Sequence, residues 1–144
     1  MTKALIVVPT YNERDNVEDI AGRLLATLSD AEILFVDDNS PDGTGQLLDD
    51  MAAREPRLHV LHRAGKLGLG TAYIAGFRWG LERDYAFFFE FDADGSHDPK
   101  YLQHMLALAE GSADVVVGSR NVPGGGTMNW GGGRKLLSRG GSFY

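Results

Sequence analysis

Asp92 and Asp94, separated by a single alanine, are the carboxylates best spaced for chemistry in this chain of 144 residues. In extended backbone, residues i and i+2 point the same way, so both side chains can reach one divalent cation. Mg²⁺ is commonly bound by one or two carboxylates together with substrate phosphates, which suits a nucleoside diphosphate carrier. The alternative is a solvated turn, but the mostly aromatic run at 85–91 favours a buried strand that aims the pair.

Two more groups of polar residues follow apolar runs of the chain. Tyr11 could stack on a base, and Glu13 or Asp38 could accept a hydrogen bond from a ribose hydroxyl or from the N–H edge of guanine. Glu13 could instead complement a helix dipole, and Asp37 and Asp42 could cap turns, which we favour for Asp42. Three acidic clusters at one edge would repel one another, which favours a bound cation or a donor-rich ligand there.

The glycine-rich segment Gly65–Gly70 could hold a phosphate on backbone N–H groups at the start of a helix, with Lys66 adding positive charge. It lacks the GxxxxGK[ST] spacing of a P-loop. Tyr73 also stands where a dinucleotide fingerprint has its third glycine. We therefore assign the segment to neither motif.

The alternation of apolar and amphipathic segments predicts the elements that must position these residues. Expected strands cover 4–8, 32–36, 58–61, 85–91 and 115–117, and expected helices cover 16–29, 46–54, 71–83 and a segment from Pro99 with Asp98 as its N-cap. Strict alternation of strand and helix indicates an α/β fold with a largely parallel sheet and helices on both faces. Ligands of such sheets bind at the carboxyl ends of the strands.

The overall composition excludes several classes of protein. There are 14 Lys and Arg against 20 Asp and Glu, so the formal net charge is −6, and there is no cysteine. The length suits one domain, and no apolar stretch approaches the ~20 residues of a membrane span, so we expect neither a transmembrane helix nor a signal peptide. Disulfides and cysteine-based metal sites are excluded, and the acidic balance argues against nucleic acid as a partner.

The charge is unevenly distributed along the chain. Residues 119–144 carry +4 and 8 of the 19 glycines, whereas residues 1–118 carry −10. A cationic, glycine-rich segment is typical of a mobile anion-binding loop or of a disordered end.

Five motifs taken together resemble the dolichol- and polyprenol-phosphate mannosyltransferases, which belong to the inverting family 2 glycosyltransferases. They occur in order along the chain at Pro9–Glu13, Val36–Thr44, Lys66–Tyr73, Asp92–Asp94 and Gly118–Arg120. The resemblance implies a GT-A nucleotide-diphospho-sugar transferase fold. It also implies transfer of mannose from GDP-mannose to a polyprenyl phosphate, with Mg²⁺ or Mn²⁺ as cofactor.

The resemblance also assigns roles to individual residues. Asp92 and Asp94 would bind the metal, and Asp94 and Arg120 would be catalytic. The acceptor phosphate would lie on Arg120, Arg134 and Ser138. With Lys66 from the glycine-rich segment, the expected donor-binding residues are Pro9, Tyr11, Glu13, Val36, Asp38, Lys66, Asp92, Ala93, Asp94 and Arg120. Residues 1–118 would thus form the donor-binding core, and 119–144 an acceptor-phosphate segment of the same domain.

A lipid-linked acceptor implies a peripheral enzyme on the cytoplasmic face of a membrane. The catalytic domain of that family is longer than this chain, so we expect a C-terminal truncation. Three alternatives stay open: a family 2 enzyme for another sugar, such as a polyprenyl-phosphate glucosyltransferase; an inactive nucleotide-sugar-binding fragment; and, more remotely, a receiver-type signalling domain, suggested by the acidic strand end at Asp37 and Asp38.

Overall fold

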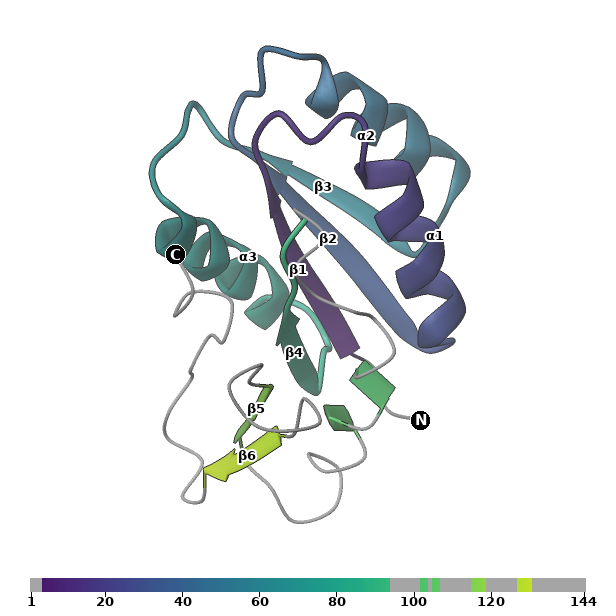
Figure 1. Cartoon of the computed structure of the whole chain (residues 1–144), viewed down its shortest axis with the longest axis vertical. Coiled ribbons are helices and arrows are strands. Elements are labelled where there is room, and N and C mark those ends of the chain that lie inside the picture. Colours follow the sequence, from purple (N-terminus) through teal and green to yellow (C-terminus); the bar gives the residue numbers. More distant parts are fainter. Residues whose placement is uncertain (1–3, 94–101, 104, 107–114, 119–126, 131–144) are drawn as a thin grey trace. The chain divides into compact units, whose positions relative to one another are not determined.

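Four parallel strands form the sheet that positions the candidate residues. In the computed structural model, which describes residues 4–93, 102–103, 105–106, 115–118 and 127–130, the strands are β1 (Ala4–Thr10), β2 (Ala31–Asp37), β3 (Leu58–His62) and β4 (Phe87–Glu90). Their order in the sheet is β3-β2-β1-β4 (Figure 1). β1 and β2 pair from Ala4 opposite Ala31 to Thr10 opposite Asp37, so these two strands end level with each other.

Helices cover both faces of this sheet. α1 (Val17–Thr27) and α2 (Thr44–Arg54) lie on one face, and α3 (Leu69–Leu81) lies on the other (Figure 1). Successive side chains of a strand point to opposite faces, so the unbroken apolar runs of β1 and β2 are buried on both sides. The core on the α3 side consists of Leu5, Val7, Leu34, Val36, Ala72, Tyr73 and Phe77. The expected largely parallel sheet with helices on both faces is therefore confirmed.

Two glycines allow α3 to lie close to the sheet. A Cβ atom on Gly76 would come within 2.4 Å of Cγ1 of Val7, and a Cβ on Gly80 would come within 2.4 Å of Cε1 of Phe88. Real Cβ atoms essentially never come so close to other heavy atoms. The absence of a side chain at these positions therefore sets the distance between the helix and the strands beneath it.

Most elements end within two residues of their predicted bounds, and the larger differences concern the last strands of the described chain. The predicted strand at 115–117 is confirmed as β5 (Val115–Gly118), but its expected place in the parallel sheet was wrong, because β5 pairs antiparallel with β6 (Thr127–Trp130) in a separate sheet. β6 itself was not predicted. β4 begins at Phe87, two residues later than expected.

The chain divides into two compact units, Met1–His97 and Asp98–Tyr144. The predicted boundary at residue 118 stays a prediction. Of the helix expected from Pro99, the described residues 102–103 and 105–106 are helical. No helix among the described residues is long and apolar enough to cross a membrane.

Candidate functional site

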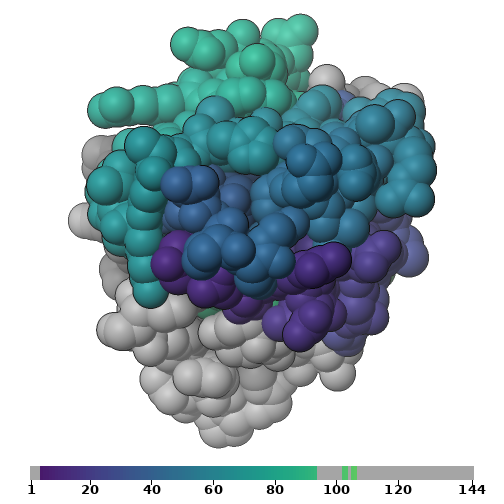
Figure 2. Space-filling model, turned by 90° about the horizontal axis from the view of Figure 1, so that it is seen from above, coloured from purple at the N-terminus to yellow at the C-terminus, as the bar shows by residue number. Residues whose placement is uncertain are grey.

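The strand order determines where a ligand of this sheet is expected to bind. The chain runs from β1 outward through β2 to β3 and then returns to place β4 on the other side of β1. In open α/β sheets, ligands bind outside the carboxyl ends of the strands at the point where the order reverses, here between β1 and β4. Figure 2 looks onto this edge, where the purple, blue and teal segments after β1, β2 and β3 lie side by side.

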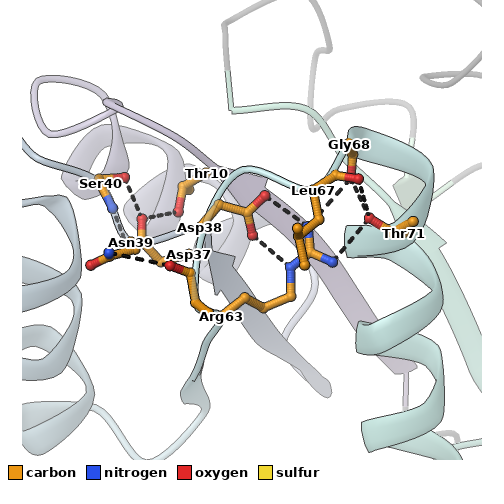
Figure 3. A network of polar contacts seen from close by, with 10 residues as sticks. Thr10, Asp37, Asp38, Asn39, Ser40, Arg63, Leu67, Gly68 and Thr71 are labelled. Atoms are coloured by element: carbon orange, nitrogen blue, oxygen red, sulfur yellow. Dashed lines mark hydrogen bonds and ion pairs between the residues drawn. The ribbon is translucent and has the colours of Figure 1, made fainter.

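Asp37 joins the segments that follow β1 and β2. It is 1% exposed and accepts hydrogen bonds from the hydroxyl of Thr10 (2.8 Å), the hydroxyl of Ser40 (2.7 Å) and the backbone N–H of Ser40 (3.1 Å) (Figure 3). The Ser40 hydroxyl also accepts from the backbone N–H of Asn12 (2.9 Å). The capping role considered for Asp37 is confirmed, because its carboxylate accepts these three hydrogen bonds within the protein.

Two asparagines and a glycine give these loops their shape. Asn12 and Asn39 have positive φ angles of 57° and 54°, and Gly43, just before α2, has a φ of 92°. Asparagine tolerates this left-handed conformation better than most residues, and glycine adopts it without steric cost. The Asn39 amide also donates to the carbonyl of Ala64 (3.3 Å), which links the loops after β2 and β3.

Asp42 caps the turn that leads into α2 and holds the loop after β1. Its carboxylate accepts hydrogen bonds from the backbone N–H groups of Thr44 (2.9 Å) and Arg14 (3.2 Å) and from the Thr44 hydroxyl. That hydroxyl accepts in turn from the backbone N–H of Glu13 (3.1 Å). Burial raises the pKa of Asp42, but the hydrogen bonds from Thr44 and Arg14 outweigh it, so the pKa lies below its ordinary value of 3.8. The predicted capping role is confirmed.

Asp38 forms a bidentate ion pair with Arg63. Nε and Nη2 of Arg63 lie 2.6 and 2.7 Å from the two carboxylate oxygens of Asp38, and both side chains are nearly buried. Arg63 also donates from Nη1 to the hydroxyl of Thr71 (3.0 Å) and from Nη2 to the carbonyl of Gly68 (3.3 Å) (Figure 3). The charge of Asp38 is therefore balanced within the protein, and the same arginine ties the loop before α3 to the end of β2.

Tyr11 and Lys66 form a cation–π contact at the carboxyl edge of the sheet. The Nζ atom of Lys66 lies 4.8 Å from the centroid of the Tyr11 ring, a cation–π distance. The ring of Tyr11 is partly open to solvent, because the residue is 37% exposed. An aromatic face and a primary amine are thus presented together, a pairing suited to a base or sugar and an adjoining phosphate.

Asp92 follows β4 and lies on the other side of β1 from Asp38. It is 3% exposed and its Oδ1 accepts a hydrogen bond of 2.7 Å from the hydroxyl of Tyr73 in α3. Ala93, the next residue, is also buried. A buried carboxylate just after β4, an edge strand of the four-stranded sheet, offers a hard oxygen ligand at the predicted position.

The structure places some of the predicted donor-binding residues at one edge of the sheet, buries one of them in the core, and does not describe the others. Pro9, Tyr11, Glu13, Asp38 and Lys66 belong to the ends of β1, β2 and β3 and the loops that follow them, and Asp92 and Ala93 follow β4. Val36 is fully buried in the core on the α3 side, so any contact with a donor would fall to its backbone. Asp94, Arg120, Arg134 and Ser138 lie outside the described residues.

Two residues that orient carboxylates of the candidate site, Arg63 and Tyr73, were not predicted from the sequence. Arg63 directly follows β3, and the rule that singled out polar residues after the other strands applies to it equally. Tyr73 is the one phenol in α3, where a buried hydroxyl needs a polar partner. Its partner, Asp92, is 19 residues away in the sequence.

Residues 5–143 match the family model described as Glycosyl transferase family 2. The chain belongs to glycosyl transferase family 2. Membership in this family excludes the receiver-domain alternative and confirms the resemblance found in the five motifs.

Curated relatives in this glycosyltransferase family are similar along nearly the whole chain. The chain is 52% identical over 142 residues to the undecaprenyl-phosphate mannosyltransferase of Micrococcus luteus and 49% identical over 143 residues to the polyprenol monophosphomannose synthase of Mycolicibacterium smegmatis. In both cases the match covers 99% of this chain, but 58% and 54% of those proteins. The dolichol-phosphate mannosyltransferase of Pyrococcus furiosus is 36% identical over 140 residues, which are 96% of this chain and 39% of that protein. The chain thus spans about half the length of its two more similar relatives.

Solved structures of glycosyltransferases share the fold. The mannosyltransferase PcManGT from Pyrobaculum calidifontis, solved with GDP-Man and Mn²⁺, matches with a TM-score of 0.64 at 22% identity, over 76% of this chain and 33% of its own. TarS 1-349 from S. aureus matches with a TM-score of 0.59, also at 22% identity, over 76% of this chain and 32% of its own. These similarities confirm the expected GT-A fold of this glycosyltransferase family member.

Proposed function

We propose that this chain belongs to an enzyme that transfers mannose from GDP-mannose to a polyprenyl phosphate with inversion of the anomeric centre, giving polyprenyl phosphate mannose. The observation that carries the proposal is the 52% and 49% identity, over 99% of the chain, to two proteins named for mannose transfer to undecaprenyl phosphate and polyprenol monophosphomannose synthesis. The arrangement of side chains at the carboxyl edge of the sheet supports it.

The donor would bind at this edge, across the ends of β1, β2 and β4. Support comes from the half-exposed ring of Tyr11 with the amine of Lys66 beside it, because a ring can stack on a base and a cation can attract a phosphate. The residues proposed to hold the guanosine are Pro9, Tyr11, Glu13, Val36 and Asp38, and those proposed for the diphosphate are Lys66, Asp92, Ala93, Asp94 and Arg120.

A divalent cation, Mg²⁺ or Mn²⁺, fits the donor set. Asp92 offers a hard oxygen ligand, already held by a hydrogen bond to Tyr73. In the part of the chain that the structure describes, no group of three or more His, Cys, Asp or Glu side chains could hold a metal alone. This agrees with a site completed by a second carboxylate, proposed to be Asp94, and by phosphate oxygens of the donor. When bound, the cation supplies positive charge that stabilises the departing diphosphate.

The acceptor needs positioning more than activation. A phosphate monoester is largely dianionic at pH 7, because its second pKa is about 6. One of its oxygens forms the bond to the anomeric carbon while the bond from that carbon to GDP breaks, and GDP leaves with the electron pair. Arg120, Arg134 and Ser138, in the basic segment 119–144, are proposed to hold the acceptor phosphate. Asp94 and Arg120 are the proposed catalytic residues, and no general base is required.

Use of a lipid-linked acceptor implies that the enzyme works at a membrane surface, and we propose peripheral association with the cytoplasmic face. A family 2 enzyme for another sugar would share the same edge of the sheet, so a glucosyl donor is the second candidate. Because the chain spans about half the length of these relatives, binding of a nucleotide-sugar without transfer is the third.

Transfer of labelled sugar to polyprenyl phosphate in detergent separates these candidates. GDP-mannose, GDP-glucose and UDP-glucose are compared as donors, with and without Mn²⁺, and binding of each nucleotide is measured by calorimetry. Mannose transfer from GDP-mannose that requires Mn²⁺ and is lost in Asp94→Asn supports the proposal. Transfer of glucose alone would establish the second candidate, and tight binding of GDP-mannose with no transfer would establish the third.

A further inference from the structure

Tyr73 and Asp92 form a buried pair between α3 and the end of β4. Each residue is 3% exposed, and the phenol hydroxyl donates a hydrogen bond of 2.7 Å to Oδ1 of Asp92. A hydrogen bond of this length to a carboxylate is charge-assisted and stronger than one between neutral groups. It therefore restricts rotation of the carboxylate at the strand end.

We propose that Tyr73 is a positioning residue for the metal and diphosphate site, acting through Asp92. The inference rests on the proposed function, in which Asp92 binds the cation. A carboxylate already held in one orientation loses less conformational freedom when a cation binds, so affinity for the cation rises. Groups that orient metal ligands in this way commonly change metal affinity by about 10- to 100-fold when removed.

The position of the hydroxyl is determined by packing that does not involve the site. The ring of Tyr73 is stacked against Phe77 with centroids 6.2 Å apart, and both belong to the core on the α3 side. One turn further along α3, the close approach of Gly76 to Val7 fixes the helix against β1. Tyr73→Phe therefore removes one oxygen atom and keeps the ring in place.

A purely structural role is the competing explanation, because any buried carboxylate needs hydrogen bonds. The chain offers a matched control for it. The hydroxyl of Tyr85 donates to Oε1 of Glu32, also at 2.7 Å, from a partly buried position. Glu32 is the second residue of β2 and lies at the amino end of the sheet, opposite to the candidate site. Tyr85→Phe thus removes the same kind of hydrogen bond away from the donor edge.

The experiment measures Mn²⁺ binding directly on the wild type, Tyr73→Phe and Tyr85→Phe. Free Mn²⁺ is followed by electron paramagnetic resonance during titration in the presence of saturating GDP, and GDP binding without Mn²⁺ is measured by calorimetry. We expect Tyr73→Phe to weaken Mn²⁺ binding about 10-fold and to leave metal-free GDP binding unchanged, while Tyr85→Phe matches the wild type in both. Thermal unfolding of each protein verifies that it is folded.

A double-mutant cycle tests whether the loss of Mn²⁺ affinity in Tyr73→Phe arises through Asp92. If Tyr73 acts through Asp92, Tyr73→Phe has no further effect on Mn²⁺ binding in an Asp92→Asn background. Equal Mn²⁺ affinity in Tyr73→Phe and the wild type, or equal losses in the two tyrosine variants, overturns the inference but leaves the proposed function standing. Absence of Mn²⁺-dependent GDP binding in the wild type overturns both.

Discussion

The guanidinium of Arg63 holds both carboxylate oxygens of Asp38, with N–O distances of 2.6 and 2.7 Å. The same guanidinium reaches the hydroxyl of Thr71 and the carbonyl of Gly68 at the start of α3. One side chain thus fixes the orientation of a predicted donor-binding carboxylate and the position of the neighbouring loop. The carboxylate crowding expected from the sequence is relieved here by a cation of the protein itself.

Replacement of Arg63 by alanine should destabilise the protein. The change leaves Asp38 nearly buried without its cation, and loss of one partner of such a pair lowers the free energy of unfolding by about 3 kcal/mol. Arg63→Lys should recover only part of the loss, because an ammonium cannot form the two parallel hydrogen bonds. Urea unfolding measures both variants. Full recovery of the free energy of unfolding in Arg63→Lys would show that a positive charge is sufficient and that the bidentate geometry is unimportant.

Alanine at Gly76 should also be costly, in contrast to alanine at Gly22. At Gly76 the new methyl group would collide with Val7, and such overpacking costs about 1–3 kcal/mol. Gly22 lies within α1, where a Cβ atom would meet no tertiary neighbour within 4 Å among the described residues, so Gly22→Ala should add up to about 1 kcal/mol through helix propensity. We expect Gly76→Ala to lower the melting temperature and Gly22→Ala to raise it. A stabilising Gly76→Ala would contradict the close packing of α3.

The capping carboxylate of Asp42 should give a stability difference that depends on pH. Because the pKa of Asp42 is lowered in the folded protein, its contribution is present above the ordinary value of 3.8 and is lost as the pH falls through the lower, folded value. Asp42→Asn should therefore be less stable than the wild type at neutral pH, and the two should converge in acid. Chemical unfolding across this range provides the measurement. A difference that stays constant with pH would mean that the charge is irrelevant.

Tyr85 should make the protein sensitive to alkali. Burial, together with the hydrogen bond to Glu32 and its charge, raises the pKa of Tyr85 well above its ordinary value of 10.0. The unfolded chain ionises this phenol near that value and the folded chain does not, so stability falls as the pH rises above it. Tyr85→Phe should lose less stability than the wild type as the pH rises above about 10. An equal loss of stability in the wild type and Tyr85→Phe would show that Tyr85 does not cause the sensitivity to alkali.

A Lys66 variant tests whether this side chain contacts the diphosphate or the base of the donor. If its amine serves the diphosphate, Lys66→Met should weaken GDP binding about 10-fold, as expected for one hydrogen bond to a charged group. Binding of guanosine, which has no phosphate, should be unchanged. Calorimetry with the two ligands provides the comparison. An equal loss for guanosine would place the role of Lys66 at the base, beside the Tyr11 ring.

Local sequence patterns predicted the strands of the four-stranded sheet well, because each strand contains neighbouring apolar residues that need no distant partner to be recognised. The run Ala4–Val8 appears as β1, extended by two residues to Thr10. β6 escaped prediction because its residues, Thr127–Trp130, form no apolar run and pair antiparallel with β5. Pairing of this kind depends on the partner strand rather than on local preference.

The candidate site was predicted in part for a similar reason. Residues such as Asp92 and Lys66 were recognised because they follow a strand or belong to a glycine-rich segment. Arg63 acquires its role from Asp38, 25 residues away, and Tyr73 acquires its role from Asp92. Contacts between distant residues leave no spacing signal in a single sequence, so the partners of both residues were found only in the fold, although the position of Arg63 directly after β3 could have marked it as a candidate.

The close approach of α3 to β1 has a consequence for the proposed metal site. Tyr73 and Gly76 lie on the same helix, three residues apart, so the depth at which the helix sits also sets the height of the Tyr73 hydroxyl relative to Asp92. A methyl group at residue 76 would push that hydroxyl away from its acceptor without touching any substrate. In the proposed metal site, affinity for the cation would then fall because a helix–sheet interface has become wider by one carbon atom, at a position away from the substrate-facing surface.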